Sequence, residues 1–116
     1  MNDTKIIELA ARSAINAGIN ITPDWNPLEN DSDAVIAASR LGIDISFDYT
    51  PSNYVIATSR DSTMTYTCIE PTGDDIGQAI RRAITRAAAA IGNRPISIPD
   101  VYQERRELNL QQETQP

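Results

Sequence analysis

The sequence contains no histidine and only one cysteine among its 116 residues. Without an imidazole, neither a Ser-His nor a Cys-His catalytic pair can form. The same lack argues against a zinc site, because the chain offers one thiol and no imidazole ligand. Cys68 has no partner for an internal disulfide, which is typical of a protein from a reducing compartment.

Long hydrophobic runs and clustered glycines are missing as well. No stretch approaches the roughly 20 apolar residues of a transmembrane helix, and residues 1–5 lack the features of a signal peptide. The five glycines form neither a phosphate-binding loop nor a dinucleotide-binding fingerprint. We therefore expect a cytoplasmic protein that does not contact membranes, is not an enzyme, and has no catalytic residue, cofactor or metal.

Charge is unevenly distributed along the chain. The formal net charge is −6, but residues 1–75 carry twelve acidic and four basic side chains, whereas residues 76–116 carry four acidic and six basic ones. An acidic body repels phosphate backbones and favours basic protein surfaces. Solubility alone is the simpler explanation for this polarity.

Every second side chain is apolar in residues 43–49, as in a β-strand with one buried and one exposed face. Turn-forming residues at 50–53 and 60–62 separate this segment from two further strands, at residues 54–59 and 63–69. Connections this short predict antiparallel hairpins. The pattern indicates a three-stranded meander.

Alternation also predicts which side chains share a face of this sheet. The more apolar face is the expected core and collects Ile43, Ile45, Phe47, Tyr49, Tyr54, Ile56, Thr58, Met64, Tyr66 and Cys68. The opposite, mixed face collects Asp44, Ser46, Asp48, Val55, Ala57, Thr65, Thr67 and Ile69. We expect the first helix or another chain to cover part of this mixed face.

Three helices are predicted from apolar residues at helical spacing, at about residues 4–17, 31–41 and 74–91. The expected N-terminal caps are Asp3, Asp31 or Ser32, and Thr72, and the expected terminators are Gly18, Gly42, Gly92 and Pro95. The last helix should lie across the apolar sheet face with a stripe formed by Ile76, Ile80, Ala83, Ile84, Ala87 and Ile91.

These elements predict an α+β fold in the order α-α-β-β-β-α, in which helices pack on a three-stranded antiparallel sheet. Residues 1–99 should form a single domain, since the length suits one core. Residues 100–116 should form a C-terminal extension, with a short helix followed by a disordered tail.

Trp25, the only tryptophan, lies between Pro23 and Pro27 in the connector that follows the first helix. The prolines restrict the backbone on both sides of the indole. The favoured interpretation is a lid on the core, anchored by Trp25 and Leu28. The functional alternative is an exposed Trp25 that acts as an interface anchor.

Two groups of charged residues are the other candidates for partner binding. Asp44 and Asp48 lie on one face of the first strand, where they keep it soluble or contact a basic partner. Arg81, Arg82 and Arg86 lie on the polar side of the last helix. They either grip a phosphate or carboxylate-rich partner, or form a solvated face that pairs with the two aspartates.

Several segments resemble small phage and prophage proteins of the phage ABA-sandwich domain type, with NinX-like proteins as relatives. The resemblance covers residues 1–92 and is carried by Trp25-Asn26-Pro27-Leu28, Asp31-Ser32-Asp33-Ala34 and Ile80-Arg81-Arg82-Ala83-Ile84. It implies an accessory protein in the cytoplasm of an infected or lysogenic bacterium that binds a host protein complex, for example a defence inhibitor such as an anti-CRISPR. Family members are mostly of unknown function, so no binding residue is carried over.

Two alternatives stay open. The order of elements over residues 31–92 is similar to that of double-stranded-RNA-binding domains, and the three arginines would then form a nucleic-acid or nucleotide site. The acidic start of the last helix, at residues 72–75, argues against this interpretation. The other alternative is a self-associating structural protein, a homodimer that closes the mixed sheet face or a free strand edge.

Overall fold

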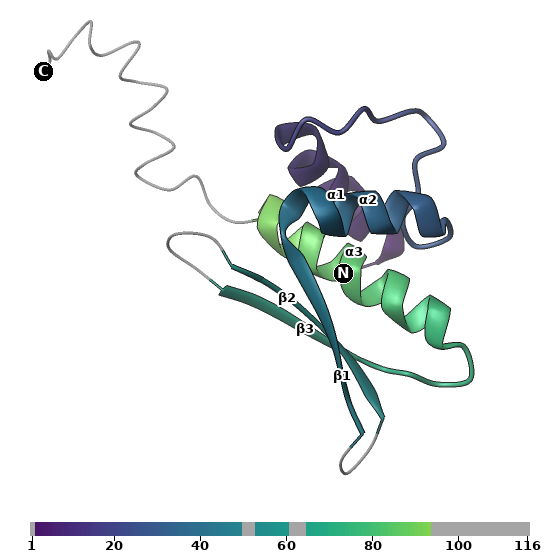
Figure 1. Cartoon of the computed structure of the whole chain (residues 1–116). Helices are drawn as coiled ribbons and strands as arrows, with labels where there is room; N and C mark the ends of the chain where they lie inside the picture. Colours follow the sequence, from purple (N-terminus) through teal and green to yellow (C-terminus); the bar gives the residue numbers. More distant parts are fainter. Residues whose placement is uncertain (1, 50–52, 61–64, 94–116) are drawn as a thin grey trace, which may run out of the picture.

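The computed structural model describes residues 2–49, 53–60 and 65–93, and its elements follow the predicted order (Figure 1). The strands form one antiparallel sheet in the order β1-β2-β3, so the predicted α+β fold and meander are confirmed. The expected extension at residues 100–116 lies outside the described residues. The elements are α1 (Asp3–Asn16), α2 (Asp31–Leu41), β1 (Ile43–Asp48), β2 (Tyr54–Arg60), β3 (Thr65–Pro71) and α3 (Ile76–Asn93).

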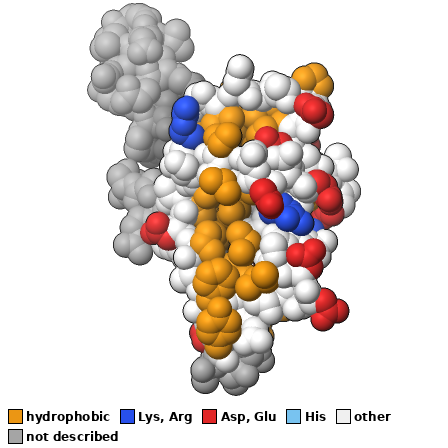
Figure 2. All heavy atoms as spheres, turned by 45° about the vertical axis from the view of Figure 1, so that its right-hand side comes forward, with side chains coloured by type: hydrophobic (Ala, Val, Ile, Leu, Met, Phe, Trp, Pro, Cys, Tyr) orange, Lys and Arg blue, Asp and Glu red, His pale blue; other side chains and the backbone are white. Residues whose placement is uncertain are grey.

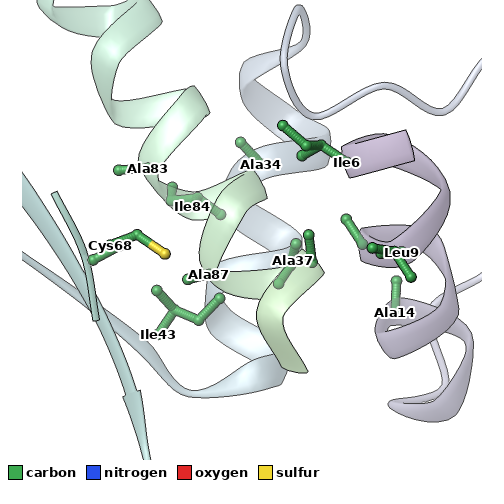
Figure 3. Packing of buried hydrophobic residues seen from close by; sticks show 14 of the residues in the cluster. Ile6, Leu9, Ala14, Ala34, Ala37, Ile43, Cys68, Ala83, Ile84 and Ala87 are labelled. Atoms are coloured by element: carbon green, nitrogen blue, oxygen red, sulfur yellow. The ribbon is translucent and has the colours of Figure 1, made fainter. Parts of the chain in front are cut away.

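Helix α3 is the central element, because it contacts every other helix and strand (Figure 1). In the close-up, Ile43 and Cys68 approach α3 from the sheet, while Leu9 and Ala14 lie on the side of α1 (Figure 3). The predicted stripe of α3 is buried in its middle, where Ile84 is only 2% exposed. A second buried side, which the stripe does not predict, includes Thr85, Ala88 and Ala89.

This second side of α3 packs closely against α1. The Ser13 hydroxyl of α1 donates to the Ala88 carbonyl at 2.9 Å. Gly92 is buried at the same crossing, where an added Cβ would lie 2.0 Å from the carbonyl oxygen of Leu9. The prediction that Gly92 ends the helix is therefore wrong: the helix continues to Asn93, and the missing side chain lets the two backbones approach.

The predicted sharing of faces is confirmed for β1 and for the described part of β3 but is wrong for β2, and Met64 lies outside the described residues. The expected burial of Phe47 and Tyr49 is also wrong, because both side chains are exposed. Val55 and Ala57 are fully buried on the helix side, whereas Tyr54 and Ile56 lie on the other face. The pairing of Asp48 with Tyr54 leaves five residues between the paired ends of β1 and β2, one more than the predicted turn. A shift of one residue moves every side chain of a strand to the opposite face.

The helix caps lie close to the predicted positions. Asn2 and Asn30 cap α1 and α2 through their side-chain oxygens, each one residue earlier than predicted. In α3, the Asp75 carboxylate accepts from the Gln78 backbone N–H at 3.0 Å, so Asp75 takes the role predicted for Thr72. Gly42 ends α2 with the expected left-handed backbone, at φ 67°.

Candidate functional site

The candidate arginines of α3 bind carboxylates and carbonyls of this chain. Arg81 donates to the Leu28 carbonyl at 3.0 Å and to the Asp31 carboxylate at 2.8 Å. Arg82 donates to the Asp3 carboxylate at 3.0 Å, and this hydrogen bond raises the pKa of the guanidinium. These contacts fasten α3 to the start of α2 and the start of α1.

Glu70 of β3 joins two of these arginines. Its carboxylate, whose side chain is 13% exposed, forms an ion pair with Arg86 and lies 3.9 Å from Arg82. Arg86 also donates to the Ile69 carbonyl at 3.2 Å. The positive charge of the α3 arginines is therefore balanced within the fold rather than directed outward.

The predicted pairing of these arginines with Asp44 and Asp48 is wrong. Both aspartates lie on the face of β1 opposite Ile43 and Ile45, which pack toward the helices. The sheet therefore stands between the two groups of charges. Asp44 and Asp48 are exposed on that face, as the alternation predicts.

A hollow of about 470 Å³ opens between α1, α3 and β3. Burial raises the pKa of the Cys68 thiol at its wall, so the sulfur stays protonated near neutral pH and is a weak nucleophile. Because Glu70 pairs with Arg86 and Asp3 pairs with Arg82, the hollow lacks the excess positive charge that would bind an anion. Its lining residues are Ile6, Cys68, Glu70, Arg82, Arg86, Ala89, Ala90 and Asn93.

Trp25 forms part of the core. Its side chain is 8% exposed, and the neighbouring Leu28 is also buried. The Asp33 carboxylate fixes the connector by accepting from the Asn26 backbone N–H at 2.8 Å. The predicted lid is confirmed, and the alternative of an exposed Trp25 anchor is wrong.

Apolar side chains are exposed instead in and just after β1 and in the first two turns of α3. We call Ile45, Phe47, Tyr49, Ile76 and Ile80 the apolar strip. Phe47, Tyr49 and Ile76 are 41%, 62% and 46% exposed. Phe47 and Tyr49 stack with ring centroids 6.2 Å apart and planes inclined by 6°. Ile45 and Ile80 are partly buried and continue the strip into the core.

Carboxylates border the apolar strip. Asp74 and Asp75 directly precede Ile76, whereas Asp48, between Phe47 and Tyr49 in sequence, points to the opposite face of the sheet at the end of β1. All three aspartates are exposed. Figure 2 shows a band of hydrophobic side chains with acidic side chains on both sides and a basic side chain among those on the right. The surface is therefore apolar at its centre and mainly negative at its rim.

We call the face of the sheet that points away from the helices the open face. It is the predicted mixed face, with the side chains of β2 exchanged between the two faces. It carries Asp44 and Asp48 of β1, Tyr54 and Ile56 of β2, and Ile69 of β3. The first helix does not cover it, because α1 packs mainly on α3, on the helix side of the sheet. Among the described helices, none packs against this face.

Comparison with known proteins gives no relative for the chain: no family model matches the sequence, and searches of curated proteins and solved structures find no significant similarity. Within the described residues, three or more potential metal ligands do not come together at any point. The described helices are all too short or too polar to cross a membrane.

Proposed function

We propose that this chain is a non-catalytic binding protein whose partner is a protein with a basic surface. The exposed apolar strip, bordered by carboxylates, is the observation that carries the proposal. A contiguous group of large apolar side chains on a protein surface commonly marks a contact site. Stacked Phe47 and Tyr49 supply contact area with few side-chain torsions to immobilise.

Charge complementarity supports a basic partner. Residues 1–75, which include the β1 part of the strip and all of its bordering aspartates, carry twelve acidic and four basic side chains. Lysine and arginine around an apolar contact area would be attracted to such a rim, and the attraction would speed association at low salt. A negatively charged phosphate backbone would be repelled.

The alternative of a nucleic-acid or nucleotide site at Arg81, Arg82 and Arg86 receives less support. Each guanidinium already donates to a carboxylate of this chain. A phosphate group would have to displace Asp31, Asp3 or Glu70, or share the guanidinium with that like-charged carboxylate. That exchange would release little net binding energy, because one anionic partner replaces another.

A narrower proposal follows from the sequence resemblance to phage and prophage proteins. In that setting the chain acts in a bacterial cytoplasm as a phage-encoded accessory factor. Its partner would be a host protein complex with a basic surface, for example a defence system whose nucleic-acid-binding surface is blocked, as by an anti-CRISPR. This narrower proposal depends on the resemblance alone.

The test is affinity capture from bacterial lysate with three forms of the full chain. Phe47→Ser/Tyr49→Ser removes the aromatic pair of the apolar strip. Val35→Ser/Ile36→Ser is the matched control, because it removes two other exposed apolar side chains, on α2. We expect the original chain and the control to retain one stoichiometric complex that the strip variant loses.

Three other results would contradict the proposal. Equal capture by all three forms would show that the strip is not the contact. Nuclease-sensitive recovery of nucleic acid alone would favour the arginine site. A dimer in light scattering that dissociates in the strip variant, with no captured protein, would favour self-association.

A further inference from the structure

We propose, building on the function above, that the partner contributes an extended segment of alternating basic and apolar residues. This segment pairs with the outer edge of β1 as a fourth strand of the sheet. β1 is an edge strand, paired only with β2 among the described residues. An edge strand presents unpaired backbone N–H and C=O groups that another chain can use.

The alternation along β1 specifies the chemistry of the added strand. Ile45 and Phe47 point to the helix side and belong to the apolar strip, whereas Asp44 and Asp48 point to the open face. Successive side chains of a neighbouring strand would lie on the same two faces. Its apolar residues would contact the strip, and its basic residues would lie beside the two aspartates.

A second copy of the chain is a poor occupant for this edge. A symmetric antiparallel pairing of two β1 strands centred on Ser46 would place Asp44 of one chain opposite Asp48 of the other. Like charges directly opposite each other destabilise a strand pair. Each chain also has a net charge of −6, so the two bodies repel one another.

A helix lying on the apolar strip is also a poorer match for the charges. Such a helix would contact Phe47 and Ile76 on the helix side of the sheet and could approach Asp74 near the start of α3. It would leave the edge of β1 unpaired. It would not reach Asp44 and Asp48, which point to the opposite face. Only an added strand uses both groups of β1 side chains at once.

The test titrates isotope-labelled full chain with a capped eight-residue peptide that alternates lysine and valine. The control peptides replace every lysine by glutamate, or place proline at two central positions. We expect the lysine peptide to bind and to slow hydrogen exchange of β1 amides, while β3 amides are unchanged. Proline should prevent this protection, because it removes backbone donors from the added strand.

Charge reversal on β1 distinguishes an added strand at the edge of β1 from a helix lying on the apolar strip. Asp44→Lys/Asp48→Lys should weaken the lysine peptide by about tenfold and improve binding of the glutamate peptide, because each cross-strand charge pair changes sign. Asp74→Lys is the matched control, since it reverses an exposed charge that only the helix mode would use. We expect it to change the affinity of the lysine peptide less than twofold.

Failure of this inference is distinguishable from failure of the proposed function. If the peptide does not bind, or binds without protecting β1 amides, strand addition is wrong. The same holds if Asp74→Lys weakens binding more than the β1 reversal does. The binding function still stands in those cases if Phe47→Ser/Tyr49→Ser abolishes capture of the partner. Capture that is insensitive to the strip overturns both.

Discussion

The two ends of α3 have similar apolar spacing but opposite surroundings. The carboxyl-terminal half is enclosed between α1 and the sheet, where Ala87, Ala88 and Gly92 are all buried. The first turn is less covered, and Ile76 is 46% exposed. A helical period of apolar residues thus predicts one continuous face but does not show where the neighbouring elements stop covering it.

The comparison also separates stability from binding. The enclosed half supplies the close contacts that hold the fold together, including the crossing with Leu9 and the hydrogen bond from Ser13. The first turn contributes apolar surface that the fold leaves uncovered and that we assign to a partner. Substitutions at the two ends should therefore have different consequences.

The largest expected effect is at Gly92. Gly92→Ala places a Cβ 2.0 Å from the Leu9 carbonyl oxygen, so α1 must move or the chain must unfold. We expect a loss of more than about 3 kcal/mol in the free energy of unfolding, measured by urea denaturation with circular dichroism.

Gly77→Ala is the matched control in the first turns of α3. Its added Cβ would lie 3.4 Å from the ends of the Arg81 and Asp75 side chains, which are not backbone atoms. The higher helix propensity of alanine should leave stability unchanged or raise it by up to about 1 kcal/mol. Equal destabilisation by the two substitutions would contradict the contrast between the ends.

Replacing a buried or an exposed isoleucine of α3 by alanine also tests the difference between its enclosed part and its first turn. Ile84→Ala removes a side chain that is 2% exposed and should destabilise the fold by about 3 kcal/mol through a cavity beneath the sheet. Ile76→Ala should cost less than about 1 kcal/mol, because its side chain is half in water. Thermal unfolding of both variants measures the difference, and similar melting temperatures would refute it.

Removal of the carboxylates that pair with the α3 arginines should cause smaller losses of stability, and the two losses should differ. Glu70→Gln removes a carboxylate whose side chain is 13% exposed from Arg86, whose side chain is 40% exposed, and we expect a loss of about 1–2 kcal/mol. Asp31→Asn removes an exposed carboxylate and should cost about 0.5 kcal/mol or less. Denaturation at low and high salt distinguishes them, since the pair with the more exposed carboxylate, Asp31, should be screened more strongly.

The smallest effect is expected at the Cys68 thiol. Its folded-state pKa is raised by burial, so the folded chain retains a proton that the unfolded chain loses at about pH 8.5. This contribution is complete below that pH and declines as the pH rises through the folded pKa. Cys68→Ala should remove this part of the alkaline decline in stability between pH 8 and 10. An identical decline in both proteins would contradict the assignment.

Local sequence patterns were sufficient for the order of the elements but not for the faces of the central strand. Period-two alternation and short turns identify three antiparallel strands, and both properties depend on residues near one another. The face on which each β2 side chain lies depends on the number of residues between the paired ends of β1 and β2. Tyr54 and Ile56 are apolar, and so are Val55 and Ala57, so the alternation does not decide between the two registers.

The candidate site was less predictable because it depends on distant segments. The carboxylate partner of Arg81 is 50 positions away, and that of Arg82 is 79 positions away. No local pattern indicates which charges will meet. The alternation correctly places Phe47 and Tyr49 on the apolar face of the sheet. Their exposure, however, depends on where α3 begins.

The position of α3 in the chain has a consequence for biosynthesis. The hydrogen bond between Ser13 and Ala88 joins residues 75 positions apart, and every other described element packs on α3, which follows all of them in the chain. Residues 1–75 therefore lack their packing partner until α3 has been synthesised. We expect compaction to follow the release of α3, with the sheet and the earlier helices remaining accessible to chaperones until then.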